Sequence, residues 1–173
     1  QWMATDFTRE RILNADATTV SVGYYEGGVY NNYWVLIFSY PENSHTEDYR
    51  QEVLNLVNAQ RAKYGLTALE MGDDALTAAA QTRAEEIAVV NSHVRPDGSK
   101  CFTVLKDYGV TDTPTGENAA WGSVSPEEVV NAWMNSEGHR ANILDPEARA
   151  MGVGYYYNSS STWGHQWIQI FTK

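Results

Sequence analysis

Cysteine is almost absent from this 173-residue sequence, since Cys101 is the only one. A single cysteine cannot close an internal disulfide, so the small disulfide-stapled scaffolds are excluded and the fold must rest on its apolar core. Positive charge is also scarce, with 12 Lys and Arg against 22 Asp and Glu and a formal net charge of −10. Without a basic run to neutralise phosphates, we expect no nucleic-acid partner and no electrostatic attraction to an anionic membrane.

Long apolar runs are missing as well. No stretch approaches the roughly 20 residues that span a bilayer, so we expect no membrane span, and no signal-peptide core is visible. Because the first residue is Gln1 rather than Met, we expect any targeting signal to lie upstream. What is present is a globular composition, 43% hydrophobic and 12% aromatic. It predicts one ordinary domain with a short appendage.

Helical periodicity begins in the second quarter of the sequence. A first helix is predicted from Ser44, which has capping-box spacing to Glu47, as far as the stop at Gly65. A second helix follows Asp73 and carries a packing face of small residues, mostly alanine. We expect it to end near residues 91–92, where Asn and Ser precede a turn-forming sequence.

The second half of the sequence alternates short helices with turn signals. Ser99 is predicted to begin a short helix that Gly109 ends, and the segment 114–122 is predicted to contain a loop at residues 116–118. The sequence Ser-Pro-Glu-Glu at 125–128 is a strong helix start, with a capping Ser, Pro at the first position and acids in the first turn. Two strand-like runs close the chain, at residues 151–157 and 163–171.

These closing strands resemble an earlier part of the same chain. Residues 12–25 match residues 143–156 without a gap, sharing Ile, Leu, Ala, Val, Gly, Tyr and Tyr, and residues 34–38 match residues 167–171. Self-similarity of this kind indicates a duplicated unit. We therefore predict that residues 1–45 are a partial repeat, the closing strand hairpin of a preceding copy. A two-stranded unit of this kind is marginal on its own in water.

Histidines and acids are the candidates for chemistry. His93 follows the predicted end of the second helix, Glu117 lies in the predicted loop beside Gly116, and His139 lies close after Glu137. The sequence contains no local metal signature, no phosphate-binding glycine loop and no nucleophile elbow. Taken alone, these residues indicate a candidate His/carboxylate site, while any single histidine is as readily explained by a structural hydrogen bond.

Several motifs in the same order resemble the CAP superfamily of cysteine-rich secretory, antigen 5 and pathogenesis-related proteins, in its bacterial SCP-like branch. They are the helix at 53–66, the pair at 92–93, the segment 116–121, the segment 132–144 and the strand 151–155. Each is only moderately specific, but their common order is specific. We therefore predict a CAP domain over residues 46–173.

This resemblance implies an α+β fold, a three-layer α-β-α sandwich with a central, mostly antiparallel sheet, to which the N-terminal β-hairpin is an appendage. It implies a cleft where His93, Glu117 and His139 converge. Eukaryotic members usually add a second Glu, and here Ser136 takes that position with Glu137 one residue further on. The resemblance also implies an extracellular or cell-surface location.

Three functions stay open from the sequence. The first is a secreted binding protein that holds Zn²⁺ or another divalent metal on His93, His139 and Glu117, or that holds a small-molecule, peptide, lipid or cell-wall ligand there, with Glu137 as a further ligand-binding candidate. The second, which we expect less, is a protease-like hydrolase that uses His139 with Glu117 and Ser136. The third is a structural module of a surface protein whose partner is a neighbouring repeat.

Overall fold

The computed structural model describes residues 2–4, 9, 12–13, 17, 19–39 and 46–173, and the chain divides into two compact units between Ser44 and His45. In the first unit, strands β1 (Thr19–Glu26) and β2 (Asn32–Ser39) form an antiparallel hairpin, preceded by the short 3-10 helix η1 (Trp2–Ala4). The hairpin expected from the sequence is therefore present. Its interpretation as part of a preceding copy stays a prediction.

A four-stranded sheet lies at the centre of the second unit, in the order β3-β5-β6-β4. Strand β3 pairs parallel with β5, and the other neighbours pair antiparallel. The bounds of the strands are β3 (Glu70–Met71), β4 (Pro114–Trp121), β5 (Ala150–Asn158) and β6 (Gly164–Thr172). The mostly antiparallel central sheet predicted from the sequence is confirmed.

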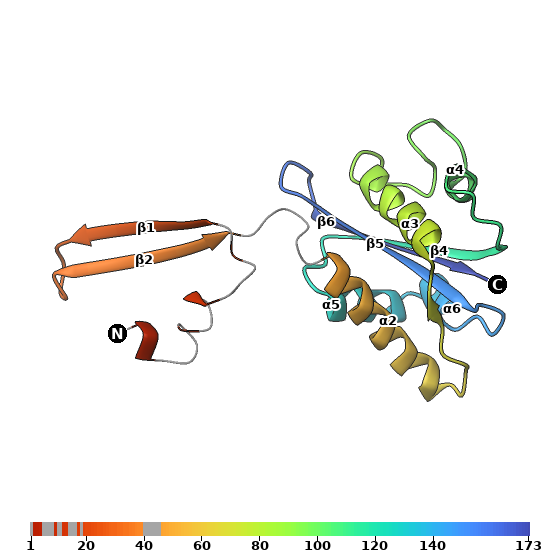
Figure 1. Cartoon of the computed structure of the whole chain (residues 1–173), viewed down its shortest axis with the longest axis horizontal. Helices are drawn as coiled ribbons and strands as arrows, with labels where there is room; N and C mark the ends of the chain where they lie inside the picture. Colours follow the sequence, from red (N-terminus) through yellow and green to blue (C-terminus); the bar gives the residue numbers. More distant parts are fainter. Residues whose placement is uncertain (1, 5–8, 10–11, 14–16, 18, 40–45) are drawn as a thin grey trace. The chain divides into compact units, whose positions relative to one another are not determined.

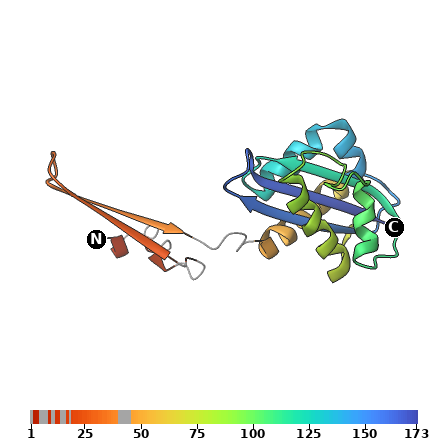
Figure 2. The same ribbon diagram turned by 90° about the horizontal axis from the view of Figure 1, so that it is seen from above.

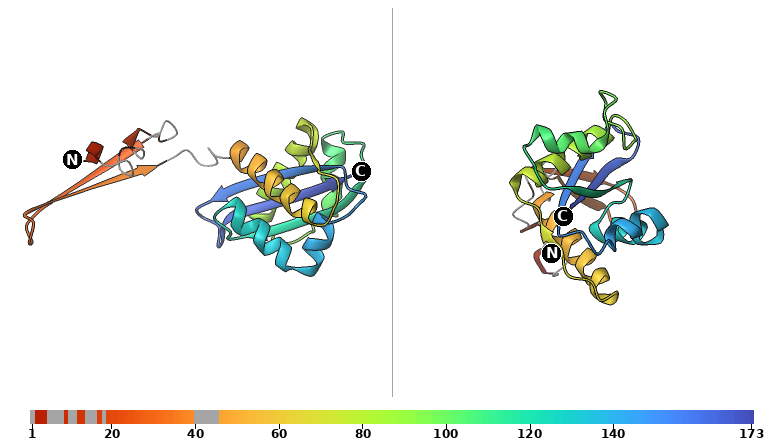
Figure 3. Two further views of the ribbon diagram at one scale, coloured as in Figure 1. Left: turned by 90° about the horizontal axis from the view of Figure 1, so that it is seen from below. Right: turned by 90° about the vertical axis from the view of Figure 1, so that its right-hand side faces the viewer.

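Helices cover both faces of this sheet (Figure 1). Helix α3 (Asp74–Ile87) packs on one face, which Figure 2 views from above, and α2 (Thr46–Lys63) packs on the other, which the left panel of Figure 3 views from below. Helices α5 (Pro126–Asn135) and α6 (Glu137–Ile143) lie on the α2 side. A separate apolar core fills each interface, the larger one beneath α2 and α5. The result is the expected α-β-α sandwich.

Two glycines let α3 approach the sheet closely. A Cβ at Gly154 would lie 2.0 Å from the carbonyl oxygen of Ala80, and one at Gly152 would lie 2.7 Å from that of Leu76. The alanine face predicted from the sequence is fully buried at this contact. Small residues on the helix and absent side chains on the strand therefore fix the distance between these two layers.

Several helix ends agree with the sequence, and one does not. Ser125 caps α5 by accepting a hydrogen bond from the backbone N–H of Glu128, and Gly109 has a φ of +71° just after the short helices η2 (Cys101–Thr103) and α4 (Val104–Asp107). The predicted capping residue Ser44 lies outside the described residues. Helix α3 ends at Ile87, before the predicted end at 91–92. The Trp121 indole N–H donates a hydrogen bond to the Ile87 carbonyl oxygen, which is then not used to continue the helix. Two β-branched valines also follow, and such residues disfavour a helix.

The sequence prediction of a loop at residues 116–118 is wrong, because these residues lie within strand β4 at the edge of the sheet. Pro114 is the first residue of the strand, a position where its missing N–H does no harm. At Gly116 a Cβ would lie 2.6 Å from the side chain of Asn142, so this glycine makes room for α6. Pro114 and Gly116 are residue types common in turns, but here one begins a strand and the other leaves space for a helix. Glu117, which follows them, is a buried strand residue.

None of the helices in the described part of the chain has the length and hydropathy needed to cross a bilayer.

Candidate functional site

A buried ion pair forms the base of the candidate site. The side chain of Glu117 is 2% exposed and that of Arg83, on the facing side of α3, is 0% exposed. Arg83 donates from Nε to Oε2 of Glu117 at 2.9 Å and from Nη2 to Oε1 at 3.2 Å. This two-pronged pairing is the geometry in which Arg binds a carboxylate most strongly, and it fixes the plane of the acid.

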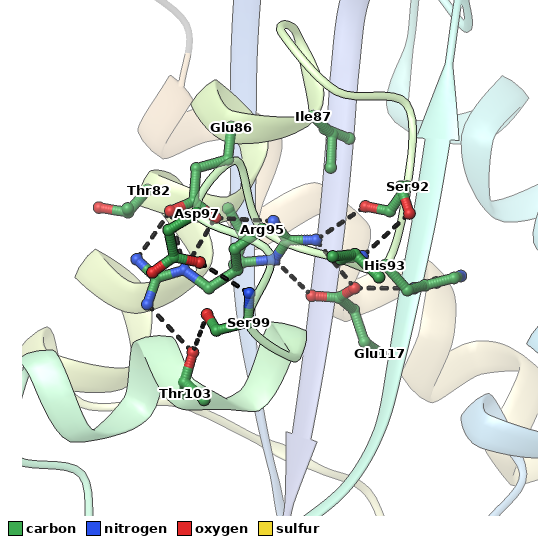
Figure 4. Close-up of polar contacts among 12 residues, drawn as sticks. Thr82, Glu86, Ile87, Ser92, His93, Arg95, Asp97, Ser99, Thr103 and Glu117 are labelled. Carbon is green, nitrogen blue, oxygen red and sulfur yellow. Dashed lines mark hydrogen bonds and ion pairs between the residues drawn. The ribbon is translucent and has the colours of Figure 1, made fainter.

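His93 lies on this acid, at the turn that follows α3. Its Nδ1 is 2.7 Å from Oε1 of Glu117, and the two side chains face each other in Figure 4. The loop that carries the imidazole is held as well, because Arg83 donates to the Ser92 carbonyl and the backbone N–H of Cys101 donates to the His93 carbonyl. Because Nδ1 is hydrogen-bonded to Glu117, Nε2 is the ring nitrogen that remains for another partner. The side chain is 55% exposed, so a ligand can reach the ring.

His139 comes from α6, which side-chain amides fasten to β4. Asn118 donates to the backbone carbonyl of His139 at 3.0 Å, and Asn142 donates to the side-chain oxygen of Asn118 at 2.9 Å. Burial lowers the pKa of His139, and the positive charge of His93 lowers it further. The structure joins His93 to Glu117 by a hydrogen bond and holds the backbone of His139 to Asn118, the next residue of β4. The convergence of all three side chains in one cleft stays a prediction.

The titration behaviour of the site follows from these contacts. The hydrogen bond to Glu117 raises the pKa of His93 above its ordinary value, against the opposing effect of burial. Burial would raise the pKa of Glu117, but the hydrogen bonds from His93 and Arg83 outweigh it and lower that pKa. The acid therefore stays ionised at neutral pH, while His139 stays neutral and able to donate its lone pair.

The residues of the hydrolase hypothesis do not assemble. Ser136 is the N-cap of α6, and Glu137 lies exposed in the first turn of that helix. Within the described part of the chain, no hydrogen bond joins Ser136 to His139, and Glu117 bonds to His93 instead. Cys101 offers no alternative nucleophile, because burial raises the pKa of its thiol to about 11.

Sequence reasoning missed the arginine side of the site. Glu86 pairs with Arg95 at 2.7 Å (Figure 4). Arg83 also pairs with Glu86 at 2.7 Å, and Arg95 pairs with Asp107 at 2.7 Å, so a chain of ion pairs runs from the acid to α4. The signal that could have revealed it is the position of Arg83 among buried alanines of α3. A cation on a packing face requires a buried partner.

The site fits a metal only in part. Both oxygens of Glu117 are engaged by Arg83 and His93, so this residue does not fit as the third metal ligand that the resemblance implied. In the described ranges, no group of three or more His, Cys, Asp or Glu side chains is arranged to hold an ion. The fit that remains uses the two imidazoles, with Glu117 as the hydrogen-bond partner that orients the His93 ring.

An α-β-α sandwich in which a histidine is hydrogen-bonded to a buried glutamate of the edge strand is typical of one class, the CAP or SCP-like domains of bacterial type. The sequence profile of the cysteine-rich secretory protein family (CAP) matches residues 54–171 of this chain. The chain belongs to this family.

Its relatives are bacterial. The uncharacterized protein YkwD of Bacillus subtilis is 42% identical over 122 residues, which cover 69% of this chain and 47% of that protein. The uncharacterized membrane protein YlbC of the same organism is 33% identical over 106 residues, which cover 60% of this chain and 30% of that protein. The chain therefore spans less than half the length of the curated relatives it matches.

Solved structures share the fold. An extracellular protein containing a SCP domain from Bacillus anthracis superposes with a TM-score of 0.67 at 24% identity, over 81% of this chain and 47% of that one. An outer surface protein from Borrelia burgdorferi superposes with a TM-score of 0.66 at 22% identity, over 76% of this chain and 96% of that one. At these identities the likeness establishes the fold alone.

Proposed function

We propose that this CAP domain is a binding module whose cleft offers the imidazoles of His93 and His139 to a ligand. One observation carries the proposal. Glu117, itself clamped by Arg83, fixes His93 through Nδ1 although more than half of that side chain is exposed. An exposed group held in one orientation loses little freedom when it binds, which favours affinity.

The ligand that best suits two such imidazoles is a divalent metal, Zn²⁺ among others. His139 contributes a neutral ring because burial lowers its pKa. Glu117 favours the tautomer of His93 whose Nε2 carries the lone pair, which is the usual role of a carboxylate beside a metal-bound histidine. With two protein ligands, a bound ion keeps positions for a small-molecule, peptide, lipid or cell-wall ligand, on which it would act as a Lewis acid.

We place this function outside the cell or on its surface. The structural relatives support this, since one is described as an extracellular protein and another as an outer surface protein. An acidic chain with a single, buried cysteine needs no disulfide to fold there.

Zinc titration calorimetry, paired with elemental analysis, tests the cleft directly. We expect close to one equivalent of Zn²⁺ for the wild type and loss of binding in His93→Ala and in His139→Ala. The matched control is His165→Ala, which removes a histidine of β6 that bonds to Tyr155 instead; it should leave the stoichiometry unchanged. No binding by the wild type, or equal binding by all variants, would show the metal proposal to be wrong.

A serine-directed probe separates this proposal from the hydrolase hypothesis. We expect no labelling of Ser136, because none of the residues that the structure describes offers it a hydrogen-bonded base. Stoichiometric labelling that His139→Ala abolishes would favour catalysis.

A further inference from the structure

The N-terminal hairpin repeats the β5–β6 hairpin in three dimensions as well as in sequence. Tyr24 lies opposite Trp34 with ring centroids 4.6 Å apart, and Tyr155 lies opposite Trp167 with centroids 4.4 Å apart. The same register holds along both hairpins, so equivalent residues face equivalent partners. Similar composition alone does not fix a register, since a slip of one residue would turn every side chain to the other face.

The correspondence also begins earlier than the hairpin. The matched positions are Trp2 with Trp133, Met3 with Met134, Arg9 with Arg140 and Tyr24 with Tyr155, each pair 131 positions apart. These residues lie in or next to α5, α6 and β5 in the CAP domain. Residues 2–39 thus follow the last four elements of a CAP domain in the order in which they occur.

The two hairpins differ in what covers them. In the CAP domain, helices cover both faces, and Trp167 and Ile170 are fully buried. In the first unit, their counterparts Trp34 and Ile37 are 55% and 62% exposed. Further large apolar side chains are exposed along both faces of the hairpin, namely Val20, Val22, Tyr24, Tyr25 and Val35. An apolar surface on both sides of a two-stranded unit indicates an interaction site.

One residue identifies what fits this surface. Gly23 is the counterpart of Gly154, where a Cβ would collide with the backbone of α3. Within its own hairpin, Gly23 has no such reason to be glycine, because a Cβ there would meet only Val35, at 3.8 Å. Glycine in a strand interior weakens it, and it commonly marks the close approach of another backbone.

We propose that the hairpin is a docking surface for CAP-type helices, supplied by the part of the same polypeptide that precedes Gln1. A helix like α3 packs on the face that carries Gly23, and a helix like α2 packs on the face that carries Trp34. The order of the repeat supports this source, because these helices precede the hairpin in the CAP domain. The helices of residues 46–173 are already packed on their own sheet.

The preceding copy has a different role from the CAP domain. Thr8 occupies the position of His139, so that copy lacks one of the two imidazoles of the cleft. We infer a structural copy next to a ligand-binding one, with one cleft per pair. The ligand-binding role in this pair rests on the proposed function of the cleft, whereas the docking of upstream helices on the hairpin does not.

Hydrogen exchange on the chain as its gene encodes it tests the proposal. The coding sequence upstream of Gln1 should hold counterparts of α2, α3 and β4 in this order. The amides of β1 and β2 should exchange as slowly as those of β5 and β6, and at least tenfold more slowly than in a chain of residues 1–173 alone. Gly23→Val should abolish this protection, whereas the matched control Glu26→Val, which adds the same side chain on the opposite face, should leave it within about twofold.

Three results would overturn the proposal. The first is an upstream sequence without such helices, and the second is rapid exchange of the hairpin in the encoded chain. The third is protection that appears in residues 1–173 alone and rises with protein concentration, which would assign the surface to a second copy. Zinc binding by the cleft is unaffected in each case, so this test and that of the proposed function fail independently.

Discussion

At the scale of single residues, the ion pair of Arg83 with Glu117 fixes the orientation of His93. The sequence offered His93, Glu117 and His139 as candidates because the motifs that carry them resemble a family, and the structure joins the first two by a hydrogen bond. The sequence was not enough to show that Glu117 is an orienting acid, since this depends on a guanidinium 34 positions earlier in the chain. Such a pairing leaves no periodic trace, and only the close packing of α3 on the sheet brings the two together.

The pKa of His93 should lie above the ordinary imidazole value of about 6.5, and the pKa of His139 should lie below it. The hydrogen bond to Glu117 raises the pKa of His93, whereas burial and the charge of His93 lower that of His139. Two-dimensional NMR of the imidazole resonances in metal-free buffer measures both values. The assignment of Glu117 to His93 would be wrong if the higher pKa belonged to His139.

Replacing Glu117 by Gln should cost about 3–5 kcal/mol of unfolding free energy, because it leaves Arg83 buried with its main partner neutral. The same substitution should lower the pKa of His93. Urea denaturation and NMR titration measure the two effects. Glu137→Gln is the control, since that side chain is exposed on α6, and it should change stability by less than about 1 kcal/mol.

At the scale of elements, the sequence predicted α2, α3, α5, β5 and β6 because each has a clear period or a capped end. It failed for β4, whose Pro114 and Gly116 resemble turn residues. Their roles depend on the edge position of the strand and on the proximity of Asn142. Both are facts of tertiary structure, which a local pattern does not contain.

Gly154→Ala should destabilise the CAP domain by about 1–3 kcal/mol or more, because the added methyl group collides with the backbone of α3. Thermal unfolding followed by circular dichroism gives the change. Gly138→Ala is the matched control, since nothing lies within 4 Å of a Cβ there and the residue is in helix α6. It should stabilise by up to about 1 kcal/mol, and equal effects of the two substitutions would contradict the packing argument.

At the scale of the whole CAP domain, the contribution of the Glu117–His93 pair to stability should be greatest between the pKa of Glu117 and that of His93. Because folding lowers the pKa of Glu117, its contribution is lost as the pH falls through that lowered value. Because folding raises the pKa of His93, its contribution is present at low pH and is lost as the pH rises through the raised value. Unfolding free energies measured against pH without metal should show both losses, and Glu117→Gln should flatten the profile.

The position of β6 has a consequence for how the domain is made. This strand lies between β5 and β4 and is the only described strand with which β4 pairs. The sheet therefore has no continuous hydrogen-bonded centre until Gly164–Thr172 is available, which is the last element of the domain in chain order. A nascent chain therefore cannot close this sheet before its final strand has been synthesised, so assembly of the domain has to wait for the end of its own sequence.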